Sequence, residues 1–150
     1  MIVRDEAELI NLGKQFGSNI KGGEVVELIG DVGAGKTTFT KGVAQGLNIQ
    51  ERISSPSFTI MKEYTGSIDN KPIFLKHYDF YRLDDAGLMK DELSDSVNKS
   101  DVVTIVEWAK DISGVLPDER MKVQINYLPE DNGREVIILQ PNSQTLEDNL

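Results

Sequence analysis

Apolar residues recur every three or four positions in two segments of the chain, as they do on the buried face of a helix. The first segment runs from Asp5 to Ile20; Asp5 and Glu8 resemble a capping box, and Gly22-Gly23 follows as a helix end. The second segment runs from Lys36 to Leu47. Its apolar stripe comprises Phe39, Val43 and Leu47. Both segments are therefore predicted to be helices that bury one face.

Six shorter runs are mostly apolar or alternate between apolar and polar residues, which is typical of β-strands. They span Glu24 to Ile29, Phe58 to Tyr64, Pro72 to Phe80, Val102 to Trp108, Met121 to Tyr127 and Glu135 to Leu139. Hairpin turns are expected at Gly66 to Lys71 and around Asn132-Gly133. The polar stretch from Asp84 to Ser100 is expected to be helical in part. Strands combined with helices in this way predict an α/β fold of three layers.

The turn between the first predicted strand and the second predicted helix has the sequence of a P-loop. Residues 30–37 read GDVGAGKT and match G-x-x-x-x-G-K-[ST] at every fixed position. Glycines let such a loop bend so that successive backbone N–H groups face phosphate oxygens, and the following helix adds its N-terminal partial charge. We therefore predict a P-loop NTPase-like fold with a mixed, mainly parallel sheet. The predicted nucleotide-binding residues are Gly30, Asp31, Val32, Gly33, Ala34, Gly35, Lys36, Thr37 and Thr38.

Lys36, Thr37 and two carboxylates are candidates for the chemistry at this loop. Lys36 is expected to bind the β- and γ-phosphates, and the Thr37 hydroxyl is placed to bind Mg²⁺. Acidic partners of a P-loop are expected at the carboxyl ends of neighbouring strands, where Asp79 and Glu107 lie. We predict that both approach the metal and that they are catalytic together with Lys36. The alternative for either acid is a strand-end carboxylate that only faces water.

Three residues near these carboxylates have two interpretations each. His77, the only histidine, is either catalytic or a packed, hydrogen-bonded strand residue, and the second interpretation is favoured. Arg82 either neutralises phosphate charge or forms a structural ion pair. Trp108 either packs against its neighbours or belongs to an exposed partner surface.

Composition excludes several classes of protein. The chain has 150 residues and no cysteine, which excludes disulfides and thiolate metal sites. Its formal net charge of −9 argues against nucleic-acid binding by the protein alone. No apolar run is long enough for a membrane helix and Met1 to Leu12 lacks a signal pattern, so we expect a cytoplasmic protein. One domain is expected over residues 1–140, followed by a frayed tail at 141–150.

Two short motifs resemble those of GTPases. Asn98 to Asp101 reads N-K-x-D, and Asp84 to Gly87 reads D-x-x-G. In a GTPase each motif follows a buried strand, whereas here N-K-S-D precedes the strand that starts at Val102. The two motifs are also too close in sequence to hold a strand and a helix between them. Both matches are therefore interpreted as chance.

With these residues assembled, the chain resembles the TsaE (YjeE) family of bacterial ATPases. Residues 30–42 are similar to the family's GDLGAGKTTFTKG stretch, and residues 55–59 (SPSFT) are similar to its SPTFT loop. Residues 77–83 (HYDFYRL) resemble H-x-D-x-Y-R-L, and residues 106–108 (VEW) resemble (I/V)-E-W. Two later elements, Leu116-Pro117 and Gly133-Arg134, resemble the family's LP and GR elements. The motifs run in the family's order from Glu6 to Leu139.

The resemblance implies a slow ATPase that uses ATP and Mg²⁺. It would act with TsaB-like and TsaD-like partners in threonylcarbamoyladenosine modification of tRNA, and would meet tRNA only through that complex. It also implies that Arg134 lies near the nucleotide and that a loop at residues 55–59 senses the nucleotide state. The residues implied for the switch or the partner surface are Ser55, Pro56, Ser57, Phe58, Thr59, Arg82 and Trp108.

Several positions depart from the family pattern. Val32 replaces a usual Leu, Ser57 replaces a usual Thr, and Leu9 lies where many members carry a Thr. Residues 87–100 depart most, which puts any partner contact through them in doubt. Two alternatives stay open: a P-loop kinase of small molecules, and a nucleotide-binding scaffold without turnover. The preference for ATP over GTP rests on the resemblance and on the misplaced N-K-S-D.

Overall fold

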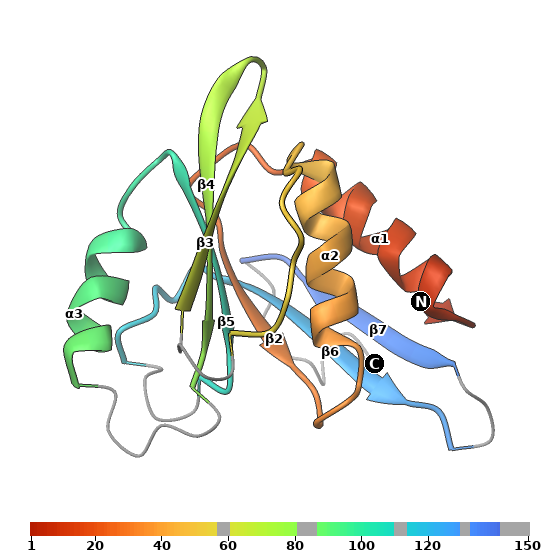
Figure 1. Cartoon of the computed structure of the whole chain (residues 1–150). Coiled ribbons are helices and arrows are strands. Elements are labelled where there is room, and N and C mark those ends of the chain that lie inside the picture. Colours follow the sequence, from red (N-terminus) through yellow and green to blue (C-terminus); the bar gives the residue numbers. More distant parts are fainter. Residues whose placement is uncertain (57–60, 81–86, 110–113, 130–132, 142–150) are drawn as a thin grey trace.

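Within the described part of the chain, a computed structural model shows seven strands in one mixed sheet, ordered β1-β7-β6-β2-β5-β4-β3 (Figure 1). The structure describes residues 1–56, 61–80, 87–109, 114–129 and 133–141. The four central strands run parallel, and antiparallel pairs flank them. The strands are β1 (Ile2–Val3), β2 (Val25–Ile29), β3 (Met61–Ile68), β4 (Lys71–Asp79), β5 (Val102–Glu107), β6 (Met121–Tyr127) and β7 (Arg134–Leu139).

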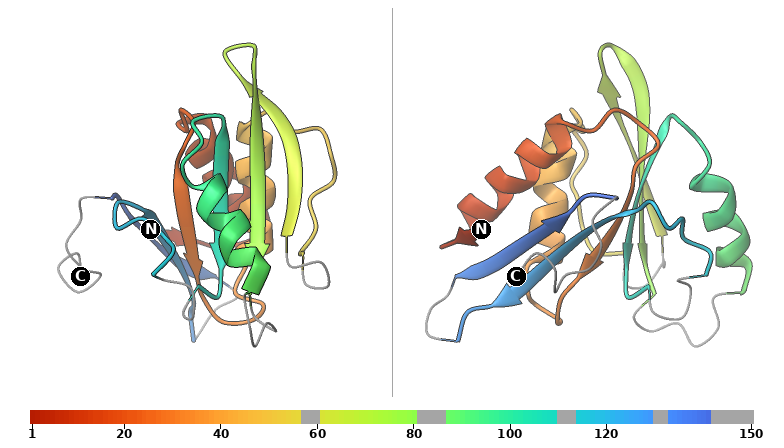
Figure 2. Two further views of the ribbon diagram at one scale, coloured as in Figure 1. Left: turned by 90° about the vertical axis from the view of Figure 1, so that its left-hand side faces the viewer. Right: turned by 180° about the vertical axis from the view of Figure 1, so that it is seen from behind.

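Helices cover both faces of this sheet, which makes the three layers predicted from the sequence. Figures 1 and 2 show α1 (Glu6–Ser18) and α2 (Lys36–Gly46) on one face and α3 (Gly87–Ser96) on the other. The fold-class prediction is confirmed. Among the described residues, no helix is both long and apolar enough to span a membrane.

The start of α1 resembles the predicted capping box, although Glu8 bonds the amide of the residue before the N-cap. Asp5 has extended backbone and its Oδ1 accepts a hydrogen bond from the Glu8 amide at 2.8 Å. The Glu8 carboxylate in turn accepts from the Arg4 amide at 2.6 Å. These bonds satisfy amide groups that have no partner within the helix.

Glycines bring α1 and α2 into backbone contact. A Cβ atom added at Gly42 would lie 2.9 Å from the Gly13 Cα atom and closer still to the Ile10 carbonyl oxygen. Added Cβ atoms at Gly13, Gly17 and Gly46 would also collide with the backbone of the opposite helix. The pair therefore packs closely because these four positions have no side chain.

Each face of the sheet has its own hydrophobic core. The larger core lies between the sheet and the α1–α2 pair and includes Phe39, Val43 and Leu47, which are fully buried as their helical stripe predicts. The smaller core lies on the α3 face and includes Tyr78, Leu93 and Val106.

The strands of the structure differ from the prediction in two places. The hairpin turn between β3 and β4 is only Asp69-Asn70, with φ values of 51° and 65°, so the strands extend through Ile68 and from Lys71. Such a two-residue turn with positive φ matches the twist of the paired strands, and it replaces the longer turn expected at Gly66 to Lys71. β1 was not expected, because two residues are too short to show alternation. The predicted start of β3 at Phe58 and the tail from residue 142 lie outside the described residues.

Candidate functional site: a P-loop at the carboxyl edge of the sheet

The P-loop connects β2 to α2 with the geometry that its glycines allow. Gly33 and Gly35 have φ values of 80° and 117°, a region that side chains disfavour. Gly35 is the N-cap residue of α2 and makes no side-chain cap bond. The first amides of α2, unlike those of α1, are therefore not capped by a side chain and can serve as anion donors.

Two side chains from the β6–β7 pair hold the loop from its outer side. The Tyr127 hydroxyl donates to the Val32 carbonyl oxygen at 3.0 Å, and Arg134 Nε donates to the Ala34 carbonyl oxygen at 2.9 Å. The Arg134 guanidinium also lies 4.3 Å above the centre of the Tyr127 ring. Both bonds engage loop carbonyl groups and use no loop amide.

Lys36 is buried at the centre of the site. Its Nζ donates to the Gly30 carbonyl oxygen at 2.6 Å, lies 3.9 Å from Glu107 Oε1 and stands 3.9 Å above the Trp108 ring. Burial lowers the pKa of the Lys36 ammonium, while the carboxylates of Glu107, Asp79 and Asp31 oppose this change. Lys36 thus bridges the loop and the strand that carries Glu107.

The two predicted carboxylates lie side by side. Asp79 at the end of β4 is in register with Glu107 at the end of β5, and Glu107 is also in register with Leu28 of β2. Because these strands are parallel, their carboxyl ends share the edge from which the P-loop leaves β2. Glu107 is almost completely buried, which contradicts the alternative of an acid that only faces water.

His77 is fully buried and its Nε2 lies 2.5 Å from Glu107 Oε2. The favoured prediction of a packed, hydrogen-bonded strand histidine is therefore confirmed. Trp108, next to Glu107, is partly exposed and has a φ value of 58°, which is rare for a bulky residue. Such backbone strain is often found at functional sites.

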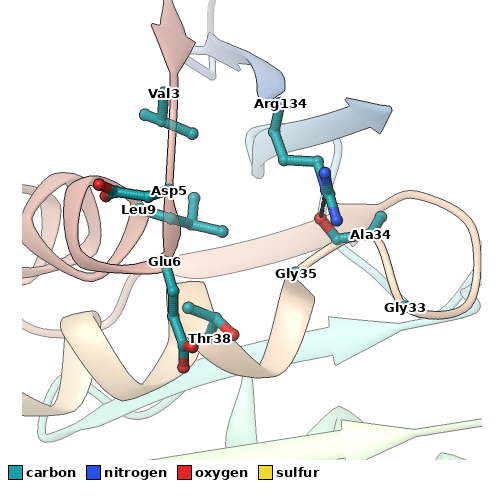
Figure 3. Close-up of a pocket in the computed structure, with 9 residues that line it drawn as sticks. All are labelled: Val3, Asp5, Glu6, Leu9, Gly33, Ala34, Gly35, Thr38 and Arg134. Carbon is teal, nitrogen blue, oxygen red and sulfur yellow. Dashed lines mark hydrogen bonds between the residues drawn. The ribbon is translucent and has the colours of Figure 1, made fainter. Parts of the chain in front are cut away.

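Hollows border the P-loop and the start of α2. A cavity of about 210 Å³ on the Thr38 side is shown in Figure 3, where Arg134 reaches over Ala34. Its lining residues are Val3, Asp5, Glu6, Leu9, Gly33, Ala34, Gly35, Thr38 and Arg134. A second hollow, of about 460 Å³, is lined by Thr37, Lys41, Arg52, Ile53, Ser54 and Ser55. Thr37 and Thr38 therefore border different spaces.

The predicted switch segment is described only in part. Ser55 is exposed at the second hollow, and Pro56 is buried. Lys62 of β3 donates to the Ser54 hydroxyl at 2.5 Å. Ser57, Phe58, Thr59 and Arg82 lie outside the described residues.

The N-K-S-D motif lies at the opposite edge of the sheet from the P-loop. It connects α3 to the start of β5, where Asn98 Nδ2 donates to the Ser94 carbonyl oxygen and the Val102 backbone amide donates to the Lys99 carbonyl oxygen. β5 runs parallel to β2, so its start is remote from the loop that follows β2. This position agrees with a chance match.

Sequence reasoning missed Tyr127 and Glu6 as site residues. Tyr127 was only the end of a predicted strand, and its contact with Val32 depends on β6 being next to β2. Glu6 was only part of the first helical turn. The only signal for Tyr127 was its position as an aromatic residue at a strand end near Asn132-Gly133. The sequence held no signal for Glu6.

The residues present fit a Mg²⁺ ion that is shared with bound phosphates. Such an ion takes oxygen ligands and needs only one or two protein carboxylates. Asp79, Glu107 and the Thr37 hydroxyl are oxygen donors on the elements that meet at this edge. In the part of the chain that the structure describes, no group of three or more His, Asp or Glu side chains could hold a metal alone.

The strand–glycine loop–helix unit, its buried lysine and the adjacent strand-end acids define a P-loop α/β protein. A family profile for "Threonylcarbamoyl adenosine biosynthesis protein TsaE" matches residues 3–136. The chain therefore belongs to the TsaE family, and the resemblance found in its motifs is confirmed.

Individual relatives support this assignment. The chain is 43% identical over 111 residues to the TsaE protein of Bacillus subtilis, a match over 74% of this chain and 66% of that protein. It is 32% identical over 140 residues to the TsaE protein of Haemophilus influenzae, covering 90% of this chain and 86% of that protein. The crystal structure of YdiB from Bacillus subtilis superposes with a TM-score of 0.75 at 34% identity, covering 95% of this chain and 84% of that one.

Proposed function

We propose that this protein is a Mg²⁺-dependent ATPase that supports threonylcarbamoyladenosine modification of tRNA. The pathway comes from the family, whose profile and relatives are described by this biosynthesis. The observation that carries the ATPase proposal is the buried contact of the P-loop Lys36 with Glu107, which lies in register with Asp79. These three charges meet where the loop amides are available.

The chain binds phosphate through its loop and Lys36. The amides at the start of α2 donate to phosphate oxygens, and the helix dipole adds to their attraction. Lys36 exchanges its bond to the Gly30 carbonyl oxygen for a γ-phosphate oxygen. Because desolvation disfavours its ammonium, a charged phosphate is a stronger partner for Lys36 than the carbonyl group it leaves.

Thr37, Asp79 and Glu107 are the residues that would hold Mg²⁺. When bound, the ion neutralises charge on the phosphates. Glu107 also accepts a hydrogen bond from the attacking water and so orients it toward the γ-phosphate. The burial of Glu107 limits the access of bulk water to this position.

The nucleoside occupies the cavity on the Thr38 side (Figure 3). Arg134 lines this cavity and bonds to the loop, so it contacts the nucleotide there. Leu9 supplies an apolar surface there in place of the Thr that many members carry.

TsaB-like and TsaD-like proteins are the proposed partners. The acidic chain, with a net charge of −9, favours a basic partner face over direct binding of tRNA. The segment at Ser55-Pro56 borders the hollow at Thr37, where it can respond to the γ-phosphate. Hydrolysis would then reset the partner complex.

The test is Mg²⁺-dependent ATP hydrolysis by the wild type and by Glu107→Gln, each with and without the TsaB-like and TsaD-like partners. We expect partner-stimulated turnover that falls about 10²–10⁴-fold in Glu107→Gln while ATP still binds. Glu27→Gln is the matched control, because Glu27 pairs with Arg120 at 2.7 Å outside the site and its loss leaves turnover unchanged.

Other outcomes identify the alternatives. ATP that binds but stays intact with every partner combination would make the protein a nucleotide-sensing scaffold. Transfer of phosphate to an added small acceptor in place of water would make it a kinase. Tight, salt-sensitive binding of purified protein to tRNA alone would contradict the indirect role of tRNA.

A further inference from the structure

His77 is a buried titratable group that the proposed mechanism does not use. It lies on β4, two residues before Asp79, and its side chain is on the face of the sheet that carries Glu107. Its Nε2 is 2.5 Å from Glu107 Oε2, and both side chains are almost fully buried. A hydrogen bond between these groups fixes one oxygen of a carboxylate that is almost fully shielded from solvent.

One nitrogen of the His77 ring makes a hydrogen bond, and the other has no partner among the described residues. Among the described residues, Nδ1 is buried and has no hydrogen-bond partner. A proton on Nδ1 would be a buried donor without an acceptor, whereas a proton on Nε2 is donated to a carboxylate. The geometry therefore favours the arrangement in which Nε2 carries a proton and donates it to Glu107.

We infer that His77 is the positioning residue of Glu107. Its Nε2–H holds Oε2, so that Oε1 is directed toward Lys36 and the P-loop, where it lies 3.9 Å from Nζ. The inference rests on the proposed ATPase function, because the orientation matters for the water and the metal that Glu107 would bind. His77 itself does not touch the nucleotide.

Hydrolysis kinetics test this role through two variants of His77. His77→Leu removes the donor, and we expect kcat to fall about 10–100-fold, the range for loss of a group that orients a metal ligand. The Kd for ATP changes less than about threefold, because loop amides and Lys36 carry binding. His77→Gln recovers most of kcat, since its side-chain amide can donate to the same oxygen.

Thr104→Val is the matched control for a change in the buried sheet. Thr104 is fully buried on β5, and its register partner Lys76 points to α3, so it lies on the face away from the site. We expect Thr104→Val to keep the kcat and the Kd for ATP of the wild type. A fall in kcat for Thr104→Val equal to that for His77→Leu, or full activity in His77→Leu, would overturn the positioning role.

A second readout is independent of turnover. Because the chain has one histidine, ¹⁵N NMR of the ring gives a single, assigned pair of signals. We expect a proton on Nε2, with the Nε2 signal shifted in Glu107→Gln. An Nε2 without a proton, or no change in Glu107→Gln, would contradict the bond.

The two readouts separate the two proposals. If the wild type never hydrolyses ATP while the NMR signals show the bond, the ATPase proposal fails and the His77–Glu107 pair remains as the arrangement that orients Glu107. If ATP is hydrolysed and the NMR signals lack the bond, the positioning inference alone fails.

Discussion

The two helical layers are attached to the sheet by different kinds of contact. On one face, α1 and α2 meet backbone to backbone at four glycines and cover the larger hydrophobic core. On the other face, α3 covers a smaller core and adds a set of polar side-chain bonds. The helix that starts at the P-loop belongs to the first layer. Its position is therefore set by the shape of the main chain, which few substitutions can preserve.

The α3 layer depends on directional bonds instead. Ser96 Oγ lies 3.1 Å from the Tyr78 hydroxyl and accepts from Lys76 Nζ at 3.0 Å. Lys76 Nζ is also 3.6 Å from Glu92 Oε1. Each bond contributes about 1 kcal/mol, so this layer loses stability in small steps.

The largest effect is expected for Gly42→Ala. The added methyl group meets the Gly13 Cα and the Ile10 carbonyl group, so the two helices must separate, and we expect the free energy of unfolding to fall by about 4 kcal/mol. Urea unfolding monitored by circular dichroism measures the loss. Gly114→Ala is the control, since a Cβ there has no atom within 4 Å, and it should be neutral.

Leu93→Ala is expected to have the next largest effect. Leu93 is fully buried in the α3 core, and the cavity it leaves costs about 3 kcal/mol. The P-loop layer is not touched, so ATP affinity measured by calorimetry on the folded protein stays unchanged. A larger loss of stability here than in Gly42→Ala would break the contrast between the layers.

Tyr78→Phe should cost about 1 kcal/mol at neutral pH, because it removes the hydroxyl that bonds Ser96. Burial raises the pKa of Tyr78 from 10.0 to about 12. As the pH rises, the Tyr78 hydroxyl loses its proton in the unfolded chain before it does so in the folded protein. The stability that the protonated hydroxyl contributes is therefore complete below pH 10.0 and is lost as the pH rises to about 12. The wild type should therefore lose more stability than Tyr78→Phe across that range, and parallel curves would contradict the shift.

Thr104→Val should produce the smallest effect, a gain of about 0.5 kcal/mol. The Thr104 hydroxyl is buried and has no partner among the described residues, so the isosteric methyl group removes an unpaired polar atom. A loss of 1 kcal/mol or more in thermal unfolding would indicate an unrecognised bond on the α3 face.

The sequence predicted those parts of the molecule that depend on local pattern. The apolar stripe of α2, the capping box of α1 and the P-loop each follow from residues close together in the chain. The family motifs also selected the two strand-end acids that the structure brings together. Local pattern could not predict which strands pair, because the order of strands in the sheet is set by the packing of the whole core.

The contacts that the sequence did not predict cross between elements. The bond from His77 to Glu107 depends on the register of β4 against β5. The contact of Tyr127 with the P-loop depends on β6 lying next to β2, and the glycine contacts depend on how α1 crosses α2. Residue type alone shows that these residues can form such contacts, and only the packed fold shows which of them are in contact.

The stacking of Lys36 over Trp108 gives the protein an optical reporter of its own. Trp108 is the single tryptophan, so the ultraviolet emission of the indole comes from one ring, and the P-loop ammonium stands 3.9 Å above that ring. Any occupant that draws the ammonium away changes the electric field at the ring and shifts the emission. The state of the loop can therefore be followed by fluorescence in an unlabelled, unsubstituted chain.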